Sequence, residues 1–233
     1  MNTGERQPLV LIPGLSCDAR LWQAQVEGLD GVARTMVGDT LSDASIAAMA
    51  QRILADAPER FALAGFSMGG YVAMEISRRA PERVTRLALL DTTGDIDTPE
   101  MARVRRAAVT TAQSRGYEAV LRGSLNRLVH PETANEVGEE VVAMALGVGL
   151  ETYIDQQNAI VGRADSRGEL ASLDVPALVL VGAQDRLTPP RYSQELAEII
   201  PGARYAEIQR AGHMTPMEQP EAVNQALREW LAA

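Results

Sequence analysis

The pentapeptide Gly65-Phe66-Ser67-Met68-Gly69 places a serine where it could act as a nucleophile. The run at residues 60–64 indicates a buried strand before it, and the apolar periodicity of residues 70–76 indicates a helix after it. Gly-x-Ser-x-Gly between a strand and a helix is the pattern of a nucleophile elbow, a turn so sharp that the residues two positions before and two positions after the serine must be glycine. The Ser67 hydroxyl would then lie at a helix N-terminus, whose amides stabilise an anion.

A histidine and an aspartate further along the chain could activate this serine. The sequence holds two histidines, and His213 lies in a loop rich in glycine and proline before the last expected helix. Asp185 follows the end of an expected buried strand at residues 176–181. Serine alone is a weak nucleophile at neutral pH, and it needs a histidine to accept its proton and a carboxylate to fix the histidine tautomer. We therefore expect Ser67, Asp185 and His213 to form a catalytic triad.

Two backbone amides are the expected donors to the negative charge that forms during acyl transfer. One is the amide of Met68, the residue directly after the serine. The other is the amide of Leu15, in the loop that follows the first expected strand at residues 9–12. Backbone donors are held in place before the reaction begins, and losing one costs about 3 kcal/mol of transition-state stabilisation.

From about Leu9 to Trp230 the chain resembles an α/β-hydrolase, the fold whose triads follow the chain order serine, acid, histidine. Among these proteins it is most similar to a small, cofactor-free group that includes 3-oxoadipate enol-lactonases, non-haem haloperoxidase-like perhydrolases and pimeloyl-carrier methyl-ester esterases. The segments that carry the likeness are Leu11-Ile12-Pro13-Gly14, Gly65-Phe66-Ser67-Met68-Gly69-Gly70, Gly182-Ala183-Gln184-Asp185, and Gly212-His213-Met214 followed by Glu218-Gln219-Pro220-Glu221.

Two departures from the family pattern concern the fold and leave the triad untouched. Many relatives carry His-Gly where this chain has Pro13-Gly14. The first expected buried strand also begins within nine residues of the start, which leaves no room for the amino-terminal hairpin common in the family. The resemblance therefore implies an α/β-hydrolase fold with a mostly parallel, doubly wound sheet of about six strands and a small helical cap.

The alternation of strands and helices predicts a single domain over residues 1–233. Residues 93–173 are the exception, since they show helical patterning without a convincing strand, and this is where the fold inserts its cap. Within that insertion, the apolar run at residues 141–150 indicates a helix facing the pocket. Elsewhere, residues 35–37 are a weak strand, and Ser42 or Ser45 is the expected N-cap of the helix that follows.

Composition limits the partners of the protein. A net charge of −9 argues against nucleic acid and anionic membranes. No apolar run reaches the roughly 18 residues of a membrane span, and residues 1–6 lack the apolar segment of a signal peptide. With a single cysteine, Cys17, no internal disulfide can form, so we expect a cytoplasmic protein. Neither a zinc-binding cluster nor a phosphate-binding loop is present, so no metal or cofactor is expected, and nothing in the sequence indicates an oligomeric state.

Three residues near the expected site admit more than one interpretation. Asp91, at the end of the expected strand at residues 84–90, is the rival acid, because some members of the fold carry theirs there. The pattern Gly-x-x-Asp followed by Pro189 favours Asp185. His130 is expected in a loop or at a helix start of the cap, with substrate contact as the alternative. Cys17 is expected to be a small buried hydrophobe, with a second nucleophile as the alternative.

These features predict a serine hydrolase that cleaves a small carboxylic ester, thioester or lactone through an acyl-enzyme on Ser67. His213 would pass the serine proton to the leaving alcohol, and water would then hydrolyse the acyl-enzyme with the same base. The alternatives are a carbon–carbon hydrolase or lyase that uses the same triad, and a low-turnover ligand receptor of the same fold. A purely structural turn is the alternative interpretation of Ser67.

Overall fold

Six strands form one sheet in the computed structural model, which describes residues 6–233. The expectation that the chain begins without a signal peptide concerns residues 1–5, which lie outside the described residues. Every neighbouring pair of strands is parallel, in the order β2-β1-β3-β4-β5-β6, so the expectation of about six mostly parallel strands is confirmed. The strands are β1 Gln7–Ile12, β2 Ala33–Val37, β3 Phe61–Phe66, β4 Val84–Leu90, β5 Ala177–Gly182 and β6 Arg204–Ile208.

The position of each strand in the sheet explains its sequence. Strands β3 and β5 are buried along their whole length, and their residues are almost all apolar because helices cover both of their faces. Strands β2 and β6 are the edges of the sheet and carry half-buried and exposed residues. The weak strand expected at residues 35–37 is the second half of β2.

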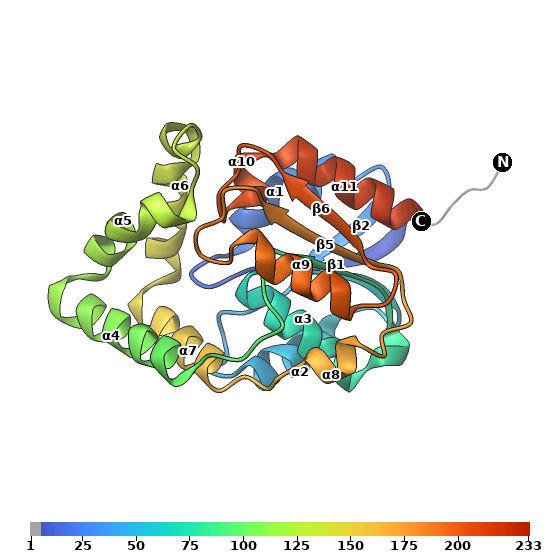
Figure 1. The fold of residues 1–233 in the computed structure, drawn as a ribbon, viewed down its shortest axis with the longest axis horizontal. Helices are drawn as coiled ribbons and strands as arrows, with labels where there is room; N and C mark the ends of the chain where they lie inside the picture. The colour runs from blue at the N-terminus through green and yellow to red at the C-terminus, as the bar shows by residue number, and fades with distance from the viewer. Residues whose placement is uncertain (1–5) are drawn as a thin grey trace.

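Helices cover both faces of the sheet, as Figure 1 shows. Because successive side chains of a strand point to opposite faces, Leu9 and Leu11 pack with the layer that contains α11, whereas Val10 and Ile12 pack with α2 and α3. The helices of these layers are α1 Gln23–Gly28, α2 Ile46–Asp56, α3 Met68–Arg79, α9 Pro190–Ile199 and α11 Pro220–Ala232, with the short helices η1 Ala19–Trp22, η2 Pro81–Arg83, α8 Arg167–Leu170 and α10 Thr215–Glu218. Of the two expected caps of α2, Ser45 makes the bond, with its Oγ 3.2 Å from the amide of Ala48.

Four long helices lie between β4 and β5 and gather beside the sheet at the left of Figure 1. They are α4 Pro99–Arg115, α5 Tyr117–Leu128, α6 Ala134–Val148 and α7 Leu150–Val161. The apolar run at residues 141–150 is divided between two of them, because Gly149 adopts a φ of 90° and turns the chain. Met144 of α6 joins the core cluster that contains Phe66 and Met214, next to the elbow and the histidine loop. None of the helices in residues 6–233 is long and apolar enough to cross a membrane.

Candidate active site

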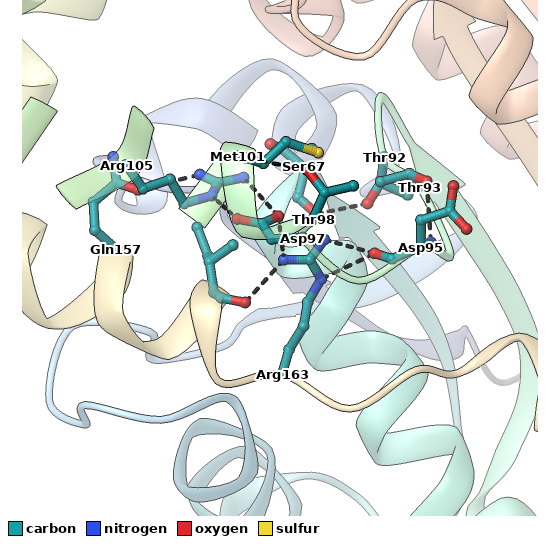
Figure 2. A network of polar contacts seen from close by, with 11 residues as sticks. Ser67, Thr92, Thr93, Asp95, Asp97, Thr98, Met101, Arg105, Gln157 and Arg163 are labelled. Atoms are coloured by element: carbon teal, nitrogen blue, oxygen red, sulfur yellow. Dashed lines mark hydrogen bonds and ion pairs between the residues drawn. The ribbon is translucent and has the colours of Figure 1, made fainter. Parts of the chain in front are cut away.

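Ser67 lies in a tight turn between β3 and α3, as the elbow pattern predicts. Its φ of 51° and ψ of −115° are rarely adopted by a residue with a side chain, so the turn is strained. A Cβ atom on Gly65 would stand 2.3 Å from the carbonyl oxygen of Gly69, and a Cβ on Gly69 would stand 2.2 Å from that of Ile12. Both glycines are therefore required by the close approach of the backbone. The turn is held by Thr92, whose hydroxyl donates to the Ser67 carbonyl oxygen at 2.8 Å (Figure 2).

The structure brings the three residues of the predicted triad into one chain of hydrogen bonds. His213 Nε2 lies 3.0 Å from Ser67 Oγ, within the reach that a general base needs. His213 Nδ1 lies 2.7 Å from Asp185 Oδ2. Asp185 and His213 are buried, and Ser67 is half-buried. This arrangement can remove the proton of the serine hydroxyl and stabilise the imidazolium that results.

The surroundings of Asp185 keep its carboxylate ionised. Burial acts to raise the pKa of Asp185, but the electrostatic interaction and hydrogen bond with His213 and the donors of Thr188 outweigh it, so the pKa lies below its usual range. Asp185 Oδ1 accepts the amides of Leu187 at 2.7 Å and Thr188 at 2.9 Å, and the Thr188 hydroxyl donates to Oδ2 at 2.7 Å. An acceptor that is ionised and fixed in this way holds the proton of His213 on Nδ1 and leaves Nε2 free to accept.

The loop that carries His213 is fixed by Glu218, a residue whose role the sequence did not reveal. Oε1 of this buried carboxylate accepts the amides of Gly212 at 2.9 Å and Met214 at 3.0 Å, the two neighbours of the histidine. Oε2 accepts the amide of His130 and the hydroxyl of Thr133, both at 2.6 Å. One carboxylate therefore joins the histidine loop to the connection between α5 and α6.

Asp91, the rival acid, makes a different set of contacts. Its Oδ1 accepts the amide of Gly182 at 2.9 Å, and its Oδ2 accepts the hydroxyl of Thr215. Complete burial, and secondly the charge of Asp185, raise the pKa of Asp91 well above its usual value. Ligand atoms of Asp91, Asp185 and His213 lie within 4.8 Å of one another, but a hydrogen bond of 2.7 Å already joins His213 Nδ1 to Asp185 Oδ2. The geometry favours Asp185 as the partner of the histidine.

The two expected oxyanion donors belong to segments that meet at the elbow. Met68 is the first residue of α3, so its amide is among those that have no acceptor within the helix. The loop after β1 passes directly over the start of this helix, since a Cβ on Gly69 would stand 2.7 Å from the Pro13 carbonyl oxygen. Leu15, two residues further along, is half-buried. Two backbone segments therefore border the place beside Ser67 where a substrate carbonyl would lie.

Cys17 and His130 have the surroundings that the sequence favoured. Cys17 is buried, as expected of a small hydrophobe, and burial together with the charge of Asp18 raises the pKa of its thiol to about 12. His130 lies in the connection between α5 and α6, where its Nδ1 accepts the amide of Glu132 at 3.2 Å. A thiol that stays protonated at neutral pH is a poor second nucleophile.

A buried ion network ties the inserted helices to the elbow helix, and the sequence did not reveal it (Figure 2). Arg163, after α7, donates to Asp97 Oδ1 at 2.8 Å, and Arg105 of α4 donates to the other oxygen of Asp97. Burial acts to raise the pKa of Asp97, but the two guanidinium groups outweigh it and hold the pKa below its usual value. The Arg163 guanidinium also lies 4.1 Å from the ring centre of Tyr71, four residues after the serine.

Residues 9–226 match the sequence model of the alpha/beta hydrolase family, and the chain belongs to that family of hydrolases. A pimeloyl-acyl-carrier-protein methyl ester esterase of Neisseria meningitidis is 28% identical over 192 residues, which cover 80% of this chain and 74% of that protein. A thermophilic esterase from Thermogutta terrifontis has a similar structure, with a TM-score of 0.89 and 33% identity over 99% of this chain and 91% of the other. The enol-lactonase of Burkholderia xenovorans has a TM-score of 0.86 and 27% identity over 100% of this chain and 94% of the other.

Proposed function

We propose that this protein hydrolyses small carboxylic esters, thioesters or lactones through an acyl-enzyme on Ser67. The observation that carries the proposal is the hydrogen-bonded chain from Ser67 Oγ through His213 to Asp185, with separations of 3.0 and 2.7 Å. In this chain Ser67 is the nucleophile, His213 the general base and acid, and Asp185 the residue that holds the histidine tautomer.

The reaction begins when Ser67 Oγ attacks the carbonyl carbon and His213 Nε2 takes the hydroxyl proton. The carbonyl oxygen becomes an anion, which accepts hydrogen bonds from the amides of Leu15 and Met68. The tetrahedral intermediate then collapses, the bond to the leaving oxygen or sulfur breaks, and His213 returns the proton to the leaving group. Water attacks the acyl-enzyme with the same base, which releases the acid and regenerates Ser67.

The substrate class follows from the chemistry that the relatives share. The Neisseria protein is named a methyl ester esterase, and the two similar structures are an esterase and an enol-lactonase. All three names describe cleavage of an acyl–oxygen bond. We further propose that residues 93–173 are the cap of the site, because Met144 of α6 belongs to the same core cluster as Phe66 and Met214, which are the sequence neighbours of the reacting serine and histidine. Contacts of this kind set chain-length preference more than chemistry.

A panel of p-nitrophenyl esters from acetate to octanoate, with one lactone and one thioester, tests the proposal. We expect measurable kcat/KM for at least one oxygen ester with the unmodified chain, and a loss of several orders of magnitude in Ser67→Ala at unchanged thermal stability. Full retention of activity in that variant would contradict the proposed nucleophile. Absence of hydrolysis across the panel would contradict the substrate class.

A further inference from the structure

The loop that carries Leu15 contains a strained turn. The Cys17 amide donates to the Gly14 carbonyl oxygen at 3.2 Å, so Leu15 and Ser16 are the two central residues of a four-residue turn. Ser16 has a φ of 60°, in the left-handed region that residues with side chains rarely adopt. Such a conformation costs on the order of 1–3 kcal/mol and persists only where surrounding groups hold it. The peptide between Leu15 and Ser16 therefore needs an external support.

That support comes from Gln156 of α7. Its side chain is completely buried, and Oε1 accepts the amide of Ser16 at 2.8 Å. Its Nε2 donates to the carbonyl oxygen of Thr40 at 3.0 Å, in the loop after β2. Both functions of the amide are used, so a single side chain of the insertion joins two core loops that precede it by 140 and 116 residues.

A second insertion residue holds the same turn from another helix. The hydroxyl of Tyr117, at the start of α5, lies 2.8 Å from Ser16 Oγ. The ring of Tyr117 packs against that of Tyr153 with 4.8 Å between the ring centres and 34° between the ring planes, and Leu15 packs against this cluster. Side chains from α5 and α7 therefore hold both the backbone and the side chain of the residue next to Leu15.

We propose that Gln156 is a positioning residue that aims the Leu15 amide at the oxyanion, and this inference rests on the proposed function. An oxyanion donor must lie 2.7–3.1 Å from the place where the charge develops. The Leu15 amide belongs to the peptide directly before the one whose N–H Gln156 accepts, so a shift of this turn would move the Leu15 amide out of range. Glutamine suits the position because one end accepts from Ser16 and the other donates to Thr40. The inserted helices thus take part in transition-state stabilisation through the loop they hold.

The test replaces Gln156 with methionine, which has a similar shape and no hydrogen-bonding amide. Gln157→Met is the matched control, because Gln157 is also a buried glutamine of α7 but bonds to Tyr153 and Arg105 instead of the loop. We expect kcat of Gln156→Met on p-nitrophenyl acetate to fall by about 10- to 100-fold, less than the roughly 10²- to 10³-fold found when one oxyanion donor is removed, because the Leu15 amide is displaced and not deleted. KM should stay within about three-fold, because the interaction is made in the transition state. Gln157→Met should keep kcat within about three-fold of the unmodified chain.

The inhibition constant of an alkyl trifluoromethyl ketone, which forms a hemiketal oxyanion with a serine, provides a second measurement. It reports on oxyanion binding, and it would not change if Gln156 only stabilised the fold. The inhibition constant should rise in Gln156→Met by the same factor as kcat/KM falls. Gln156→Glu, whose protonated carboxyl group can accept from Ser16 and donate to Thr40, should recover most of both. If Gln156→Met does not fold, retained kcat in Gln156→Glu supports the inference and a loss like that of Ser67→Ala overturns it. Equal losses in Gln156→Met and Gln157→Met, or an unchanged inhibition constant, also overturn it. A parent protein that neither hydrolyses the ester nor binds the ketone overturns the proposed function itself.

Discussion

Replacing Asp185 with asparagine changes one atom of the side chain and removes its charge. Oδ1 accepts two backbone amides, at 2.7 and 2.9 Å, so the asparagine oxygen will take that place. Its NH2 group must then face His213 Nδ1, which lies 2.7 Å from Oδ2 in the present structure. An NH2 group donates and cannot accept, so the histidine must carry its proton on Nε2. In that tautomer His213 cannot take the proton of Ser67.

The expected loss is a factor of about 10⁴ in kcat, the size found when a triad aspartate is replaced by asparagine and the histidine takes the wrong tautomer. At about 1.36 kcal/mol for each tenfold change, this corresponds to about 5.4 kcal/mol of barrier. KM should change little, because the substrate carbonyl does not touch Asp185 in the proposed mechanism. The assay is steady-state hydrolysis of the best p-nitrophenyl ester, with thermal unfolding measured on the same preparation.

Asp91→Asn is the matched control at the neighbouring carboxyl group. Burial, and secondly the charge of Asp185, raise the pKa of Asp91 well above its usual value, so loss of its charge should matter less than loss of the Asp185 charge, and asparagine keeps the shape of the side chain. Its partners are Gly182 and Thr215, and the histidine keeps its own acceptor. We expect kcat to fall by less than about tenfold. The reverse ranking of the two variants, both folded, would assign the acid to Asp91 and refute the reasoning.

Three further predictions concern stability and reactivity. Asp97→Ala leaves the guanidinium of Arg163, whose side chain is 3% exposed, without its partner, so the free energy of unfolding in urea should fall by about 3 kcal/mol. Glu132→Ala breaks an exposed ion pair and should lower it by less than about 1 kcal/mol. Equal losses in the two variants would contradict the buried network. The folded-state pKa of Asp97 lies below its ordinary 3.8, so the stability that its ionised form contributes is present above about pH 4 and is lost as the pH falls through the folded-state pKa. The free energy of unfolding should therefore fall less steeply below pH 4 in Asp97→Asn than in the unmodified chain. Cys17, with a thiol pKa of about 12, should react slowly with iodoacetamide at pH 7.5 in the folded protein, and at least about 100-fold faster once guanidinium has unfolded the chain. A similar rate in both states would show that the thiol is accessible and ionised in the folded protein.

The parts of the site that the sequence predicted are those with a local physical signal. The glycines around Ser67 are forced by backbone contacts within the turn, and Asp185 is marked by the fully buried strand before it. His213 stands between residues that break regular structure. Such signals lie within a few residues of the functional side chain, and parallel strands then bring their carboxyl ends together.

The parts that the sequence did not predict depend on how the inserted helices dock on the sheet. Gln156 contacts Ser16 across 140 residues, and Glu218 contacts His130 across 88. A single buried glutamine in a helix has no spacing that distinguishes it from its neighbours. The same reason applies to Arg163, whose acidic partner lies 66 residues earlier. Long-range polar pairs of this kind become visible only when the packing of the insertion is known.

The covalent intermediate on Ser67 is the central claim, and labelling followed by mass spectrometry tests it most directly. The protein is treated with a fluorophosphonate, digested with trypsin and sequenced by fragmentation. Since the chain has no lysine, cleavage after arginine releases residues 61–78, which contain both Ser67 and Ser77. The account predicts one adduct, assigned by fragment ions to Ser67, with simultaneous loss of esterase activity and no adduct in Ser67→Ala. An adduct on Ser77, Cys17 or another residue, or full activity after stoichiometric labelling of Ser67, would contradict it.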